Sequence, residues 1–128
     1  MLFTRYIPCL LLKGDGLVKT VNFKNPKYVG DPINTVRIFN EKEVDELIFL
    51  DIEATPQNKE PNYKLLSEIA SECFMPLAYG GGLKNIEQAK KIFSIGLEKV
   101  IINSEAHNNK NLIGEIAKIY GTQAVVGV

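Results

Sequence analysis

"VDELIFL" at residues 44–50 has a counterpart 53 positions later, "LEKVIIN" at residues 97–103. Both are apolar runs of strand-forming residues, and both follow an amphipathic helical pattern. The apolar positions of those helical patterns align at the same offset: Ile33 with Ile86, Val36 with Ala89 and Phe39 with Ile92. A duplicated strand–helix unit would produce this spacing, and a chance similarity between two amphipathic segments would produce it as well.

Strands and helices alternate along the whole chain. Short runs rich in Ile, Leu and Val predict strands at 5–12, 46–52, 76–79, 99–103 and 123–128. Amphipathic patterns predict helices at 32–43, 61–73, 85–95 and 109–119. Such alternation is typical of right-handed crossovers in a parallel sheet, whose ligands gather at the carboxyl ends of the strands. The first predicted helix has Asp31 as its expected N-cap, followed by Pro32.

The length of the chain limits the architectures that fit this pattern. A (β/α)8 barrel needs about 250 residues, so 128 residues accommodate about four βα units plus a fifth strand. We therefore expect an α/β fold that is a fragment of a TIM-type barrel, with residues 1–128 forming half of one domain. A complete, flavodoxin-like sheet of five strands is the competing interpretation.

The composition is that of an ordinary globular domain. Apolar residues make up 45%, and 15 basic residues balance 15 acidic ones. This balance argues against a nucleic-acid partner or an anionic membrane surface, and no apolar run reaches the length of a membrane span. Cys9 and Cys73 show no disulfide or metal-ligand spacing. We expect reduced thiols in a cytoplasmic protein that needs no metal or cofactor.

Two turns that follow predicted strands carry residues suited to an anion. "GGG" at 80–82 precedes a helix, so its backbone N–H groups and the helix dipole can meet a phosphate. Asn103 and Ser104 follow the next strand and can donate further hydrogen bonds. Tight turns with helix caps would leave the same pattern, so both interpretations stay open.

Three charged residues open predicted strands: Arg5, Glu46 and Lys99. Barrel strands alternate between inward and outward positions. If these charges point inward, apolar residues such as Ile48 and Ile101 lie above them, and the charges must pair with one another at the barrel floor. Surface charges that merely flank the strands are the alternative.

Seven stretches together resemble the HisF family, the cyclase subunit of imidazole glycerol phosphate synthase. They follow the family's order over essentially all of the chain: "RYIPCL" (5–10), "LVKTVNFKN" (17–25), "GDP" (30–32), "DELIFLDI" (45–52), "YGGGL" (79–83), "EKVIINS" (98–104) and "GTQAVV" (121–126). The family is a (β/α)8 barrel. The resemblance therefore implies that this chain is the barrel's N-terminal half plus its fifth strand.

The resemblance also implies an enzyme, a synthase of the lyase class. Its glutaminase partner delivers ammonia at the barrel bottom, and the ammonia is added at the top to a phosphorylated substrate. A phosphate site is implied at Gly81, Gly82, Asn103 and Ser104. An ammonia gate is implied at Arg5, Glu46 and Lys99. Lys19, in a long predicted loop at 13–30, is implied to close over the substrate as a catalytic residue.

One position departs from the family pattern. The family ends its first strand with an inward aspartate that acts as general acid or base, and here that position is Leu11. A leucine cannot transfer a proton. The stretches "CLLLKG" (9–14) and "NPKYVGDPIN" (25–34) resemble a HisF-like branch linked to acetamidino-sugar synthesis for surface polysaccharides, and the lost carboxylate agrees with that resemblance. The alternatives are the histidine-pathway cyclase itself, a related sugar-phosphate isomerase barrel, or a non-catalytic scaffold for a partner.

Overall fold

A computed structural model describes residues 7–14, 16–21, 24–42, 44–52, 60–103 and 109–128. Its strands are β1 Cys9–Lys13, β2 Gly16–Val21, β3 Lys24–Gly30, β4 Leu47–Asp51, β5 Leu77–Gly80, β6 Lys99–Ile102 and β7 Val125–Gly127. Its helices are α1 Pro32–Glu41, α2 Tyr63–Glu72, α3 Ile86–Ile95 and α4 Asn109–Tyr120, followed by a 3-10 turn at Thr122–Ala124. The predicted helices and parallel strands are confirmed to within a few residues at each end.

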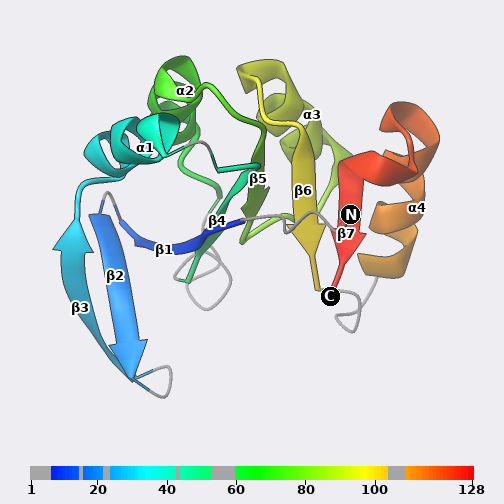
Figure 1. The fold of residues 1–128 in the computed structure, drawn as a ribbon. Helices are drawn as coiled ribbons and strands as arrows, with labels where there is room; N and C mark the ends of the chain where they lie inside the picture. The colour runs from blue at the N-terminus through cyan, green and yellow to red at the C-terminus, as the bar shows by residue number, and fades with distance from the viewer. Residues whose placement is uncertain (1–6, 15, 22–23, 43, 53–59, 104–108) are drawn as a thin grey trace, which may run out of the picture.

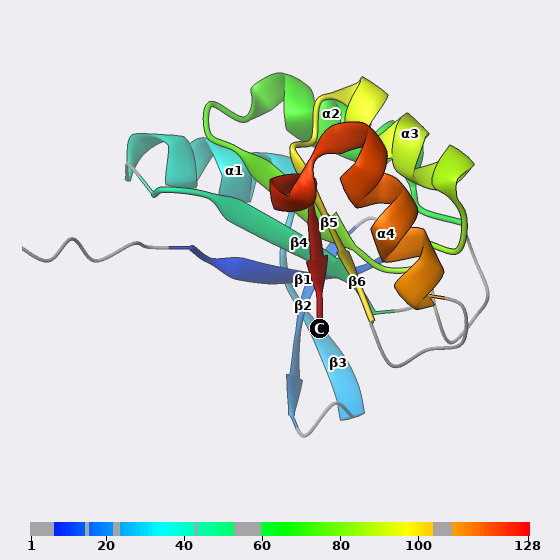
Figure 2. The same cartoon turned by 90° about the vertical axis from the view of Figure 1, so that its right-hand side faces the viewer.

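The strands form one sheet in the order β3-β2-β1-β4-β5-β6-β7. The strands β1, β4, β5, β6 and β7 lie side by side in chain order and run parallel, and the hairpin of β2 and β3 extends the sheet beyond β1. A flavodoxin-like sheet would place its first strand between later ones, so that interpretation is wrong. All four helices cover the same face of the sheet (Figures 1 and 2), which is the arrangement of half a (β/α)8 barrel.

The segment 13–30, predicted as a loop, instead forms the antiparallel hairpin of β2 and β3 at the edge of the sheet. The pairing of Lys13 with Gly16 leaves a two-residue connection that begins with Gly14 at φ 60°. Positive φ at this position is typical of tight hairpin turns. The prediction failed because the glycines were interpreted as a flexible loop rather than as the turn that folds β2 back onto β1.

Short polar side chains start three of the helices. The Asn34 backbone N–H donates to Asp31 Oδ2 over 3.1 Å, and Pro32 opens α1, as predicted. Asn62 caps α2 and Asn85 caps α3 in the same way. Because each cap satisfies a backbone donor that the helix cannot, these residues set where each helix begins, at the edge where the strands end.

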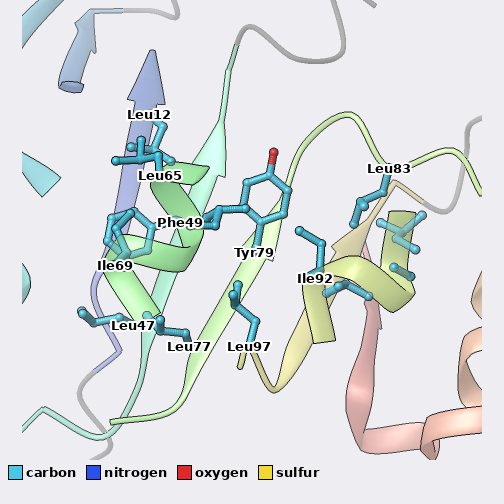
Figure 3. Close-up of a cluster of buried hydrophobic side chains, with 14 of the residues drawn as sticks. Leu12, Leu47, Phe49, Leu65, Ile69, Leu77, Tyr79, Leu83, Ile92 and Leu97 are labelled. Carbon is cyan, nitrogen blue, oxygen red and sulfur yellow. The ribbon is translucent and has the colours of Figure 1, made fainter. Parts of the chain in front are cut away.

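The hydrophobic core lies between the sheet and the helices (Figure 3). Every second residue of the parallel strands points into it, as the period of a β-strand requires. The fully buried members are Val36, Leu47, Phe49, Leu66, Ile69, Tyr79, Ala89, Ile92, Val100 and Ile116. The alternate residues face the opposite side, and no helix of the described segments covers that inner face.

Candidate functional site

Residues on the inner face line up in rows across the parallel strands. Strand pairing aligns one row as Leu11, Leu50, Gly80, Ile101 and Val126. The row nearer the strand beginnings is Cys9, Ile48, Ala78 and Lys99. The side chains that these rows place together are apolar except for Lys99. The inward alternation expected from the sequence is therefore confirmed, and within these two rows the charge lies at the lower end, at Lys99.

Glu46 and Lys99 meet at this lower end. Lys99 Nζ lies 3.2 Å from Glu46 Oε1, and the side chains are 32% and 6% exposed. Because Glu46 is level with Pro76 while Lys99 is level with Ala78, the two residues start from different rows. An offset of two residues over two strands is the stagger that brings alternate strands of a barrel to one level, so the expected pairing of inward charges is found for Glu46 and Lys99. Arg5 lies outside the described residues.

The glycine turn at the opposite end of β5 is fitted against β4. Gly81 has φ 127°, and a Cβ there would lie 2.8 Å from the Asp51 carbonyl oxygen. Gly82 follows at φ 70°. Both the left-handed backbone and the close approach require glycine at 81. The turn therefore rests on the end of β4 and leads directly to the start of α3.

A buried glutamine fixes the exit from this turn. Gln88 Oε1 accepts a hydrogen bond of 2.7 Å from the Lys84 backbone N–H, and the Gln88 N–H donates to the Asn85 cap over 2.9 Å. Its amide also donates to Glu60 Oε1 over 3.4 Å. These bonds tie the turn, the first turn of α3 and the entry to α2 together. Gln88 was not predicted from sequence, although its spacing from Asn85 resembles a capping box.

The candidate phosphate residues share one edge of the sheet. The register that aligns Gly80 with Ile101 places Gly82 and Asn103 each two residues further along. Asn103 is exposed, and its carbonyl accepts a 2.8 Å hydrogen bond from Asn109 Nδ2. Ser104 lies outside the described residues, as does His107. An anion at this edge would meet the N-terminus of α3, where the backbone and the dipole favour negative charge.

Lys19 and Leu11 lie on β2 and β1, next to the candidate phosphate edge along the sheet rather than at it. Lys19 belongs to β2 rather than to a loop, and it pairs with Lys27 of β3. Leu11 pairs with Val18 on one side and Leu50 on the other, and its side chain is half-buried. Leu11 thus occupies the inner face at the end of β1, where the sequence predicted it, and supplies no proton there.

Sequence reasoning missed a polar group behind the sheet. Asp51 ends β4, and Tyr79 points its hydroxyl toward the same end of the strands (Figure 3). Burial raises the pKa of Tyr79, and the charge of Asp51 and the neighbouring Tyr63 raise it further. Within the described segments, the buried hydroxyls of Tyr63 and Tyr79 have no hydrogen-bond partner. The position of Asp51 directly after the apolar run at 47–50 could have indicated this polar group from the sequence.

The two thiols are separate and weakly acidic. Cys9 and Cys73 are free, and burial raises the pKa of each. A raised pKa lowers the thiolate fraction at neutral pH, so neither is a good nucleophile. The described segments contain no cluster of His, Cys, Asp and Glu that could hold a metal ion. Those segments also contain no helix that is long and apolar enough to cross a membrane.

Comparison with known proteins identifies relatives over nearly the whole chain. The family model described as "Histidine biosynthesis protein" matches residues 5–128. A Pseudomonas aeruginosa protein named "Putative imidazole glycerol phosphate synthase subunit hisF2" is 65% identical over 127 residues, which are 99% of this chain and 51% of that protein.

More distant relatives carry similar names. A Leptospira borgpetersenii protein named "Putative imidazole glycerol phosphate synthase subunit HisF" is 54% identical over 126 residues, 98% of this chain and 50% of that protein. The "Imidazole glycerol phosphate synthase subunit HisF" of Streptococcus mutans is 41% identical with the same coverage. The chain spans about half the length of these relatives. It belongs to the histidine biosynthesis protein family, in its HisF group of TIM-type barrels.

Proposed function

We propose that the protein is a HisF-type synthase subunit that adds ammonia to a phosphate-bearing substrate, and that this chain is the N-terminal half of its single barrel domain. The observation that carries the proposal is the arrangement along the inner face. A partly buried ion pair closes one end, apolar rows fill the middle, and a glycine turn that leads into a helix stands at the other end. This arrangement separates an entry for ammonia from a site for an anion.

Each end of the inner face has a distinct role in this mechanism. At the lower end, Glu46 and Lys99 act as the gate, with Arg5 as their further partner. Neutral ammonia then crosses the apolar rows past Ala78 and Ile101, which disfavour ions because unpaired charges are costly in such surroundings. At the upper end, the substrate's phosphate binds at Gly81, Gly82, Asn103 and Ser104. Lys19 contacts the substrate from the hairpin.

The names of the relatives favour one reaction, the imidazole-ring closure of histidine biosynthesis. Relatives from 65% down to 41% identity are all named as subunits of imidazole glycerol phosphate synthase. The word subunit in those names also supports a partner, and we propose that a glutaminase supplies the ammonia at the strand N-terminal face. The full-length protein, mixed with ammonium salt and the cyclase substrate, should form imidazole glycerol phosphate.

Leu11 favours a second candidate reaction. Without a carboxylate at the end of β1, the same ammonia route would serve a different acceptor, an acetamido group of a nucleotide sugar that becomes an acetamidino group. The test is to assay the full-length protein with both acceptors and to repeat the assay with Leu11→Asp. Cyclase turnover in the wild type assigns the histidine reaction. Little wild-type cyclase activity that rises in Leu11→Asp supports the second reaction, and activity with neither acceptor rejects both.

The phosphate site has a test that does not depend on the reaction. Inorganic phosphate titrated into the full-length protein should bind, as measured by calorimetry, and Asn103→Ala should weaken that binding. Gln123→Ala is the matched control, because Gln123 is exposed in the 3-10 turn before β7, at the opposite edge of the sheet. Equal phosphate binding by both variants would remove Asn103 from the site.

A further inference from the structure

The turn between α2 and β5 exposes an aromatic ring. Phe74 is 86% exposed, more than any other large apolar side chain of the described segments. Single exposed apolar residues are common on protein surfaces, so exposure alone assigns no role. A role in binding requires that the turn is ordered and that it lies on a surface where a partner binds.

Hydrogen bonds from a neighbouring helix hold the backbone of this turn. The Phe74 N–H donates to Asn40 Oδ1 over 3.0 Å, and Asn40 Nδ2 donates to the Glu72 carbonyl over 2.8 Å. One amide side chain of α1 thus bridges the two backbone groups on either side of Cys73. Arg37 adds an ion pair to the Glu72 carboxylate, with Nη2 and Oε1 3.1 Å apart. The turn is ordered before any partner arrives, which lowers the entropic cost of binding.

The turn lies at the edge of the sheet where the proposed ammonia entry lies. All turns that lead from a helix into a parallel strand run along this edge, opposite the ends of the strands (Figure 1). Leu47 follows Glu46, and its backbone N–H donates a 3.0 Å hydrogen bond to the Pro76 carbonyl. Phe74 is therefore two residues from the strand position that is level with the buried carboxylate.

The neighbouring turns at this edge add exposed acidic side chains. Asp45 precedes β4 and Glu98 precedes β6, and both are exposed. The Glu98 N–H donates to the Leu77 carbonyl over 2.9 Å, so its turn is fixed directly beside the start of β5. Because β5 lies between β4 and β6, the turn that carries the exposed Phe74 lies between the turns that carry Asp45 and Glu98. A complementary surface is an apolar pocket with basic residues on its rim.

We propose that Phe74 is the anchor residue through which this face docks the ammonia-supplying glutaminase subunit, with the ring seated in an apolar pocket and Asp45 and Glu98 facing basic side chains. This inference rests on the proposed function and assigns it a specific contact. Aromatic residues at the centre of an interface commonly carry much of the binding energy. A rigid ring beside the entry would also hold the partner's outlet over the Glu46–Lys99 pair.

The test is binding of the full-length protein to each glutaminase-type subunit of its own organism, purified and titrated by calorimetry. We expect Phe74→Ala to raise the Kd for the subunit that binds the wild type at least about tenfold. Glutamine-dependent synthesis should fall at subsaturating partner, while synthesis from ammonium salt stays at the wild-type level. Phe74→Tyr should restore most of the affinity, because it keeps the ring.

Matched controls separate this contact from a general loss of apolar surface. Ile38→Ala and Ile119→Ala remove exposed apolar side chains from the outer surfaces of α1 and α4, and they should leave the Kd unchanged. If the wild type binds a glutaminase and the Kd of Phe74→Ala is within twofold of the wild-type Kd, Phe74 is not the anchor residue, while the proposed function stands. If the wild type binds none, both fail. A Phe74→Ala effect on self-association alone, seen by light scattering, would also overturn the proposal.

Discussion

The two faces of strand β4 have opposite environments. Leu47 and Phe49 point toward the helices and are 0% exposed, whereas Ile48 and Leu50, between and after them, are only half-buried on the inner face. The helix-side residues pack into one continuous core, and the inner residues line rows that end in an ion pair. The difference separates residues that hold the fold together from residues that are available for a ligand path.

The largest expected effect tests the helix-covered face. Phe49→Ala should lower the free energy of unfolding by about 3–5 kcal/mol, because the cavity would open in a fully packed core. Ile48→Ala, one residue away on the other face, should cost much less. Urea unfolding of variants of this 128-residue chain, in which the inner face is half-exposed, measures both by circular dichroism. Equal losses would mean that the two faces contribute equally to stability.

The next effect concerns the ion pair of Glu46 and Lys99 on the inner face. Lys99→Ala removes the partner of a nearly buried carboxylate and should lower the free energy of unfolding by about 1–3 kcal/mol, less than for a fully buried pair because Lys99 is one-third exposed. Lys99→Met keeps an apolar side chain of similar length, so its loss of stability measures the contribution of the charge without that of packing. Lys90→Ala, an exposed lysine on α3, is the control. A Lys99→Ala loss no larger than that control would show that Glu46 does not depend on the pair.

A smaller change in the free energy of unfolding, of opposite sign, is expected at Tyr79, a polar side chain on the helix-covered face. The buried Tyr79 hydroxyl lacks a hydrogen-bond partner within the described segments. Removing such a hydroxyl abolishes its desolvation cost, so Tyr79→Phe should raise the free energy of unfolding by about 1 kcal/mol. Thermal unfolding monitors the change. A clear loss of stability would mean that the hydroxyl is hydrogen-bonded in solution, and a loss of activity with unchanged stability would give it a role in the site.

The smallest expected effect lies outside both faces, at the exposed pair of Arg37 and Glu72. The hydrogen bond and charge of Arg37 lower the pKa of Glu72 below its ordinary value of 4.5. A lowered carboxyl pKa stabilises the fold above the unfolded-state value, and this contribution is lost as the pH falls through the folded-state value. Arg37→Ala should therefore destabilise slightly at pH 7 and not at all near pH 2. The urea midpoints of wild type and variant at both pH values measure this, and an equal difference at both would contradict it.

Local sequence patterns predicted the elements well and the hairpin poorly. Asp31 with Pro32 marked the start of α1, because a cap and its helix are neighbours in the chain. The strand predicted at 46–52 was recognised from the apolar run at 47–50, which is typical of parallel strands. Strands β2 and β3 were missed because a glycine-rich segment is equally compatible with a loop, and the turn at Gly14 that folds β2 back onto β1 was not recognised.

The sequence by itself determined which residues share a face, since alternation along a strand has a period of two and belongs to the chain. Only the tertiary structure decided which residues meet from distant segments. The reach of Lys99 to Glu46 depends on the stagger between strands. The fit of Gly81 against Asp51 depends on how closely two strand ends approach. The bridge from Asn40 to Phe74 depends on the packing of α1 beside α2. Stagger, approach and packing are distances between segments, and no local pattern specifies them.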